Sequence, residues 1–251
     1  MNRQQRANVS VVPHRRHEGL FIVNGQLCTK NLFPGDDDKD DLLFLQQNED
    51  GTEEVHYRVW DPSTSPLAAV VLKGVDYFSI KPGAKVLYLG AASLATVSHL
   101  SDIVGSSGMV YAVTSFSSLF TQLSDMAIKR TNVTPINEDP SDPFKYRNLV
   151  GTHVDVMLSE IPLDCQVQMM ALNASYFLKV GGHFVVSFEP ERINFGLPIP
   201  FRSVIVLQYS RLHGHRLEPS QEVNIGGGLF YYVGTYKGRA QVESQTTVKH
   251  C

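Results

Sequence analysis

Apolar and polar residues alternate in two different ways along this chain, and the pattern changes near residue 84. Residues 11–76 contain short strand-like runs separated by turn residues. Gly19–Val23 (GLFIV) is followed by Asn24-Gly25, which is a strong hairpin signal. Residues 56–60 predict another strand and residues 67–74 a short helix. This first third is too small for an independent core, so we predict a small β-rich extension packed on the main domain.

From residue 84 onward, strand-like and helix-like segments follow one another. Apolar runs occur at 85–89, 109–113, 154–158 and 183–188, and amphipathic stretches near 95–104, 117–130 and 166–179 lie between them. Two further strand candidates, 204–208 and 230–236, follow. Strands that alternate with helices predict βαβ units and a mainly parallel sheet, so we expect an α/β fold.

Composition narrows the class of protein. Hydrophobic residues make up 43% and charged residues 19% of the 251 residues, which is typical of a globular chain. The apolar runs are far too short to span a bilayer, so we expect a soluble protein without a membrane partner. The net charge of −3 gives no overall positive field for nucleic acid. Three distant cysteines without a CxxC predict neither a disulfide framework nor a zinc site, and favour a reducing compartment.

Two charged segments allow more than one interpretation. The first seventeen residues carry four arginines and two histidines but no acid. They suit a solvated, poorly ordered terminus, an RNA-contacting arm or an organelle presequence. The acidic run at 35–41 predicts a solvated loop, since it lacks the spacing of an EF-hand. The close histidine pairs have no acidic or cysteine partners at ligand spacing, so we predict no metal site.

Small residues follow the strand predicted at 85–89. In an open α/β sheet, ligands bind beyond the carboxyl ends of the strands. The turn Gly90-Ala91-Ala92-Ser93 would let a ligand approach the backbone and the N-terminus of the next helix. It is not a GxGxxG fingerprint, and a tight turn without a ligand explains the same residues. The turn therefore indicates a site only in combination with other strand ends.

Polar residues end the next two strands. Val113-Thr114-Ser115 stands where nucleoside-binding domains usually carry an acid for the ribose hydroxyls. Thr114 and Ser115 accept hydrogen bonds without charge assistance, so their contact would be weaker. Glu138-Asp139-Pro140 follows the third strand. An acid in this segment could reach an adenine amino group, or it could cap a helix or a turn.

Two carboxylates follow the fourth and fifth strands. The fourth strand is predicted to end at residue 159, directly before Glu160, and the fifth at residue 188, directly before Glu189. One interpretation is an acid/base pair at the edge of the sheet. The simpler interpretation is a solvated rim of acids, because Glu191 follows closely.

Long segments of this chain resemble the fibrillarin family, the methyltransferases of box C/D ribonucleoproteins. The resemblance runs from about residue 11 to 237. It rests on Pro13–Phe21, Thr29–Gly35, Tyr57–Asp76, Ile80–Ser93 (IKPGAKVLYLGAAS), Thr96–Gly105 (TVSHLSDIVG), Gly108–Val113, Lys129–Asn132, Lys145–Arg147 and Gly181–Ser187 (GGHFVVS).

This resemblance implies a Rossmann-like S-adenosylmethionine (SAM)-dependent methyltransferase fold, with a seven-stranded mixed sheet and a small β-rich N-terminal domain. We therefore divide the chain into a disordered basic stub (1–10), the N-terminal domain (11–78), the methyltransferase domain (79–238) and a C-terminal tail (239–251). The family methylates ribose 2′-hydroxyls of ribosomal RNA (rRNA) in the nucleolus of the nucleus. Its implied partners are a box C/D guide RNA, coiled-coil scaffold proteins and a kink-turn-binding protein, and a core histone is a further substrate credited to it.

The resemblance also implies which residues bind SAM. They are Gly90, Ala91, Ala92, Ser93, Ala95, Thr96, Thr114, Ser115, Asp139, Pro140 and Glu160. The chain departs from the family in this loop, with Leu94 in place of Gly and Ala95 in place of Thr. Thr114 replaces the acid that ends the second strand.

The catalytic positions depart further. The family's set is Lys, Asp, Lys and His, and the matching positions here carry Pro66, Glu160, Glu189 and Leu229. Glu160 alone keeps its chemical type. Losing one preorganised group costs roughly 2.7–4 kcal/mol of transition-state stabilisation. Three interpretations follow: an active RNA 2′-O-methyltransferase, a catalytically impaired paralogue that binds RNA and protein partners, and a SAM-binding regulator between them.

Overall fold

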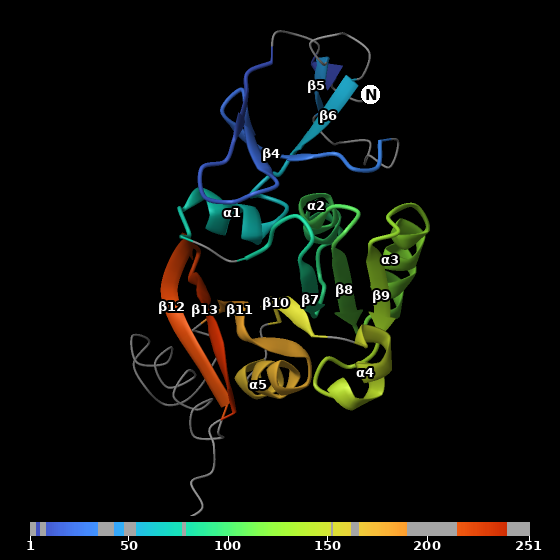
Figure 1. Cartoon of the computed structure of the whole chain (residues 1–251), viewed down its shortest axis with the longest axis vertical. Coiled ribbons are helices and arrows are strands. Elements are labelled where there is room, and N and C mark those ends of the chain that lie inside the picture. Colours follow the sequence, from blue (N-terminus) through green and yellow to red (C-terminus); the bar gives the residue numbers. More distant parts are fainter. Residues whose placement is uncertain are drawn as a thin grey trace, which may run out of the picture.

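The computed structural model describes residues 4–5, 9–34, 43–47, 54–76, 79–151, 153–161, 166–189 and 215–239. These residues form two β-sheets and the helices that pack on them (Figure 1). The acidic run at 35–41, the strand candidate at 204–208, Glu191, Cys165 and Cys251 lie outside the described residues.

The N-terminal sheet has six strands. They are β1 (Gln4–Gln5), β2 (Val11–Pro13), β3 (Leu20–Val23), β4 (Gln26–Lys30), β5 (Leu43–Gln47) and β6 (Glu54–Val59). Their order is β1-β5-β6-β4-β3-β2, and every pairing is antiparallel except β1 with β5. Asn24-Gly25 joins β3 to β4, which confirms the predicted hairpin.

The second sheet has seven strands in the order β12-β13-β11-β10-β7-β8-β9. Its strands are β7 (Lys85–Leu89), β8 (Met109–Thr114), β9 (Val133–Asn137), β10 (Val154–Ser159), β11 (Leu178–Phe188), β12 (His215–Gly226) and β13 (Leu229–Arg239). The strands from β11 to β9 are parallel, and β12 and β13 are antiparallel. The predicted α/β class, with a seven-stranded mixed sheet, is confirmed.

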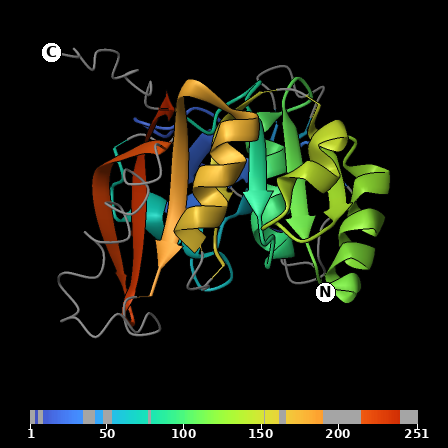
Figure 2. The same ribbon diagram turned by 90° about the horizontal axis from the view of Figure 1, so that it is seen from below.

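Five helices occur in the described residues: α1 (Pro66–Leu72), α2 (Leu94–Val104), α3 (Ser117–Lys129), α4 (Pro143–Val150) and α5 (Gln166–Phe177). Helices α2 and α3 contact β8 and β9, whereas α4 and α5 contact each other and α5 packs on β10 and β11. Figure 2 shows α5 running alongside the strands, on one face of the sheet. No described helix is long and apolar enough to cross a membrane.

Sequence patterning missed α4 and β12. Helix α4 buries only Pro143, Tyr146 and Val150, while Phe144 and Leu149 are exposed, so no continuous apolar stripe marks it. Strand β12 lies at the edge of the sheet, contains Pro219 and is interrupted by register shifts. An edge strand tolerates proline because half of its backbone groups need no partner in the sheet.

The apolar runs are buried on both faces of the large sheet. In β7, Val86 and Tyr88 join the hydrophobic core shared with α1, α2 and the N-terminal sheet, whereas Leu87 and Leu89 join the core under α4 and α5. A parallel strand covered on both faces needs apolar residues at every position. This explains why β7 reads as a continuous run.

The N-terminal sheet is joined to α2 by a buried carboxylate. Asp102 Oδ2 accepts hydrogen bonds from Arg58 of β6 at 2.8 Å and from the Thr29 hydroxyl of β4 at 3.0 Å. Its Oδ1 accepts from Arg130 at 2.7 Å and from the Leu32 backbone N–H at 3.2 Å. The side chains of Arg58, Arg130 and Asp102 are at most 3% exposed, so the two arginines neutralise the carboxylate away from water.

His99 extends this network. Its Nδ1 lies 2.8 Å from the Thr29 hydroxyl, and its ring stacks on Trp60 with centroids 5.5 Å apart. Thr29 gives its single proton to Asp102, so the imidazole must donate to Thr29. Burial, followed by the charges of Arg58 and Arg130, holds the pKa of His99 well below its usual range, and the ring is therefore neutral.

Arg16 and His17, at the end of the basic N-terminal segment, pack against the loop after α1. Arg16 donates to the Gly74 carbonyl at 2.8 Å and pairs with Asp76 at 3.2 Å. His17 is buried, and burial followed by the nearby His14 lowers its pKa to about 4, so it is neutral near pH 7. These two side chains therefore bind the protein itself.

The division of the chain into domains at 1–10, 11–78, 79–238 and 239–251 stays a prediction.

We expect Asp102→Asn to lower the free energy of unfolding by about 3–5 kcal/mol, because two buried guanidinium groups lose their counterion. Chemical denaturation checks this. The matched control is Asp142→Asn, since Asp142 forms an exposed pair with Lys145 at 3.6 Å, and its loss should cost no more than about 1 kcal/mol. Equal effects of the two substitutions would contradict the structural role of Asp102.

Candidate functional site

The order of strands changes direction beside β7. From β7 the chain adds β8 and β9 on one side of the sheet, and then returns to place β10 and β11 on the other side. In open α/β sheets, ligands bind at such a switch point, beyond the carboxyl ends of the strands. Leu89 of β7 is paired with Ser159 of β10. The turn at 90–93 and Glu160 therefore leave neighbouring strands at the same edge.

Ser93 fixes the start of α2. Its hydroxyl oxygen accepts from the Thr96 N–H at 3.1 Å and its hydroxyl donates to the Thr64 carbonyl at 3.3 Å. The Thr96 hydroxyl is buried and lies 2.8 Å from that of Ser65, the residue before α1. Both side chains hold the turn against residues 64 and 65.

Gly90 is needed for the approach of a neighbouring side chain. Gly90 has φ of +67°, and a Cβ at this position would lie 1.9 Å from Cγ1 of Ile161. The small residue thus lets Ile161, which follows Glu160, pack directly on the turn. Close approach to the backbone was predicted here for a ligand, and in this structure Ile161 makes it.

The carboxylate of Glu160 is enclosed by two tyrosines. The Tyr88 hydroxyl donates to Oε2, and the Tyr231 hydroxyl of β13 donates to Oε1 at 2.5 Å. The Ala92 backbone opposes part of the rise that burial causes in the pKa of Tyr88, so the turn after β7 lies beside the acid after β10. Burial raises the pKa of Glu160, and the two tyrosine hydrogen bonds oppose part of that rise. Burial is thus the main cause of the raised pKa.

The polar ends of β8 and β9 bond to their own turns. Thr114 is 1% exposed and accepts from the Phe116 N–H at 3.3 Å, whereas Ser115 is exposed. Asp139 accepts from the Ser141 N–H at 2.8 Å, and hydrogen bonds from the Ser141 backbone and side chain lower its pKa. The turn-capping interpretation of Asp139 describes this geometry, and the residue itself is exposed.

The remaining predicted SAM contacts are divided between the surface and the interior. Ala92 is exposed and Ala95 is half-buried. Ala91 is buried, and its N–H donates to the Val113 carbonyl at 3.0 Å. Pro140 is also buried, and its carbonyl accepts from Tyr146 at 3.1 Å and from Asn173 at 2.8 Å.

The other three catalytic positions of the family occupy different environments. Pro66 is the first residue of α1, where its fixed φ suits the start of a helix. Leu229 begins β13 and packs against the core shared with Tyr231 and Val233. Glu189 follows β11 and is half-buried. Because a leucine side chain cannot take up or release a proton, position 229 contributes no proton-transfer chemistry.

Tyr88, Tyr231 and Ile161 were not predicted as site residues. Tyr88 lies within the apolar run of β7, and a buried tyrosine usually finds a hydrogen-bond partner, so it carried a usable signal. Tyr231 reaches the site from a strand that follows residues 190–214 in the chain. Its pairing with Glu160, 71 positions away, has no local signature.

Fold and site together define a Rossmann-like methyltransferase fold in which two tyrosines enclose a half-buried acid at the strand ends. A model of the fibrillarin family matches residues 11–227. The chain belongs to the fibrillarin family.

Similar proteins support this assignment. The chain is 49% identical over 222 residues to the Arabidopsis thaliana rRNA 2′-O-methyltransferase fibrillarin 2, covering 87% of this chain and 68% of that protein. An Aeropyrum pernix fibrillarin with natively bound S-adenosyl-L-methionine is 29% identical with a TM-score of 0.78, covering 92% of this chain and all of that one. A fibrillarin in complex with Nop5p is 27% identical with a TM-score of 0.70, and the match covers 88% of this chain and 98% of that one.

We expect Gly90→Ala to destabilise the protein by about 1–3 kcal/mol, because its methyl group must displace Ile161. Adding Ile161→Ala should make the double variant at least about 0.5 kcal/mol more stable than the sum of the single changes. Gly151→Ala is the control for backbone strain alone, since Gly151 has φ of +61° and its Cβ would lie 3.5 Å from the nearest atom. Strictly additive effects in denaturation would show that the two residues do not clash.

The raised pKa of Glu160 predicts a pH dependence. Below its ordinary value of 4.5, the acid is protonated in both folded and unfolded chains. As pH rises through the folded-state pKa, ionisation is more costly in the folded chain, so the wild type loses stability. We expect Glu160→Gln to gain stability relative to the wild type between pH 4 and pH 7, as measured by thermal unfolding. A difference that is constant across this range would contradict the shift.

Proposed function

We propose that this chain is the methyltransferase component of an RNA-guided ribonucleoprotein that methylates ribose 2′-hydroxyls of rRNA, with SAM as methyl donor. One observation carries this proposal. The turn at 90–93 lies beside Glu160, which two tyrosines enclose, at the switch point of a fibrillarin-type sheet. The relatives named as rRNA 2′-O-methyltransferases support the same reaction.

The exposed residues at this edge suit a nucleoside ligand. Ala92 lies in the turn, Ser115 follows β8 and Asp139 follows β9, and all three are exposed. We assign Ser115 to the ribose and the Asp139 carboxylate to the adenine amino group. SAM supplies an activated methyl group when it is bound. The other predicted contacts are buried or half-buried, and we assign them to the floor of the site.

Glu160 is the proposed catalytic residue. A ribose 2′-hydroxyl is a weak nucleophile near neutral pH, so it must be oriented and relieved of its proton. Burial raises the pKa of Glu160, which makes its carboxylate a better proton acceptor. Tyr88 and Tyr231 hold the carboxylate in place.

The proposed partners are those of a box C/D particle. They are a guide RNA and its rRNA target, coiled-coil scaffold proteins and a kink-turn-binding protein, within the nucleolus of the nucleus. A similar fibrillarin has been solved with Nop5p, which supports a protein scaffold. A glutamine of a core histone is a further proposed substrate.

A second candidate is the same assembly role without methyl transfer. Pro66, Glu189 and Leu229 replace the basic residues of the family's catalytic set. Both carboxylate oxygens of Glu160 already accept hydrogen bonds, and Leu229 packs against an apolar core. A site with these features lacks positive charge where negative charge develops on the 2′-oxygen.

Two measurements separate the candidates. Calorimetric titration of the purified chain with SAM comes first, and an affinity no better than millimolar would exclude methyl transfer. The chain is then assembled with guide RNA, scaffold protein and kink-turn-binding protein, and radiolabelled SAM is added. Label on the target ribose, lowered roughly 10²–10³-fold by Glu160→Gln, supports the enzyme. Assembly and SAM binding without label support the second candidate.

We also expect Pro66→Lys with Glu189→Lys to change the free energy of unfolding by less than about 1 kcal/mol, because neither side chain is fully buried. If these lysines restore charge at the reacting oxygen, label incorporation should rise. A large fall in melting temperature would show that the two positions do not border an open site.

A further inference from the structure

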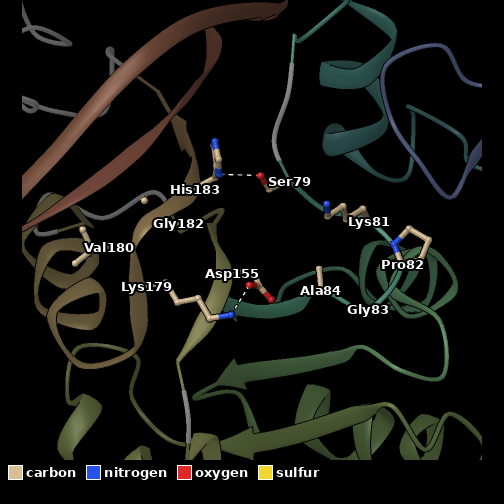
Figure 3. Close-up of a pocket in the computed structure, with 11 residues that line it drawn as sticks. Ser79, Lys81, Pro82, Gly83, Ala84, Asp155, Lys179, Val180, Gly182 and His183 are labelled. Atoms are coloured by element: carbon tan, nitrogen blue, oxygen red, sulfur yellow. Dashed lines mark hydrogen bonds and ion pairs between the residues drawn. The ribbon is translucent and has the colours of Figure 1, made fainter.

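A pocket lies at the edge of the large sheet opposite the proposed methyl-transfer site. Its volume is about 420 Å³, and its walls are residues 79–84, which lead into β7, together with the first residues of β10 and β11 (Figure 3). Five residues of β7 at about 3.3 Å each separate this edge from the turn at 90–93 by about 16 Å. The two sites therefore share a strand but no surface.

Positive charge dominates this pocket. Lys179 pairs with Asp155 at 2.7 Å, so that carboxylate is neutralised within the wall. Lys81 also lines the pocket, and no carboxylate in the described residues forms an ion pair with it. Lys85 acts on Asp155 and Lys237 acts on His183, so both add to the positive field. A concave surface of one sign concentrates counter-ions.

A hydroxyl and an imidazole add hydrogen-bonding groups. The Ser79 hydroxyl lies 2.7 Å from Nδ1 of His183, and Figure 3 shows this pair joining the two walls. Ser79 has φ of +57°, and among the described residues Asn24 is the only other non-glycine residue with a positive φ. A serine in the left-handed region is strained, and such strain concentrates at ligand sites. Burial, and then Lys237, lowers the pKa of His183.

The wall that β11 forms is an irregular part of that strand. Val154 pairs with Leu178 and Val156 pairs with His183, so residues 179–182 bulge out of the ladder. Gly181 has φ of +84°, and a Cβ added to it would meet no atom within 4 Å, so its backbone is open to the pocket. Bulges of this kind often lie beside binding sites.

We propose that this pocket binds a phosphate group, carried either by a phosphorylated small molecule or by an RNA strand. Lys81 approaches from one wall and Lys179 from β11, and the Ser79–His183 pair, which uses one of its two protons in its own hydrogen bond, offers at most one more donor. Donors that converge from several directions suit a tetrahedral anion better than a planar carboxylate. This site is separate from the methyl-transfer site, and the proposal does not depend on the proposed function.

Sodium pyrophosphate is the first probe, titrated into the purified full chain by calorimetry. Lys81→Met should weaken binding by about tenfold or more, because it removes an ammonium group from the wall. Lys30→Met is the control, since Lys30 is exposed on the N-terminal sheet. No measurable binding at millimolar pyrophosphate, or equal weakening by both substitutions, would overturn the proposal.

A second pair of variants tests the site independently of Lys81. Gly181→Asp places a negative charge in the open space and should abolish binding, whereas Gly181→Asn keeps the size and the tolerance of a positive φ without the charge. Melting temperatures of the two should agree. Equal binding by both variants would overturn the proposal.

Competition then identifies the source of the phosphate. A 5′-phosphorylated oligoribonucleotide that displaces pyrophosphate, where its 5′-hydroxyl counterpart does so more weakly, assigns the site to an RNA terminus. Equal displacement by both assigns it to backbone phosphates. Displacement by nucleotides alone assigns it to a small molecule. Polyglutamate that binds in a Lys81-dependent way while pyrophosphate does not would overturn the phosphate assignment in favour of an acidic protein segment.

Discussion

Asp102 places a carboxylate in the interior between the N-terminal sheet and α2, where Arg58 and Arg130 reach it from different parts of the chain. A buried charge is tolerated only when it is paired and hydrogen-bonded. Thr29 and the Leu32 N–H supply the additional hydrogen bonds, so neither oxygen lacks a partner. The relative placement of the two sheets therefore depends on one acid with two cations.

This constraint reaches the site through α2. The same helix carries Asp102 near its C-terminal end and begins beside the turn at 90–93. The Ser93 and Thr96 hydroxyls hold that beginning against residues 64 and 65. Anchoring at both ends fixes the turn relative to β10, where Glu160 meets Tyr88 and Tyr231. The site is thus assembled by contacts far apart in sequence.

Local patterns predicted the elements whose burial is complete. The runs at 85–89, 109–113 and 154–158 became β7, β8 and β10 because a strand covered on both faces needs apolar residues throughout. Helix α4 and strand β12 escaped prediction, since both lie at the surface and bury few of their residues. The strand ends at Glu160 and Asp139 were predicted as polar positions, and the turn-capping interpretation of Asp139 matches its contact with Ser141.

The amino-acid sequence by itself determined the α/β class, the hairpin at Asn24-Gly25, the small-residue turn after β7 and membership of the fibrillarin family, because each depends on neighbouring residues. The tertiary structure alone decided that Ile161 packs on Gly90, that two tyrosines enclose Glu160, and that Lys81, Lys179 and His183 line one pocket. These contacts join strands that are adjacent in the sheet but distant along the chain. Hydrophobic periodicity carries no information about such pairs, since their geometry follows from strand order.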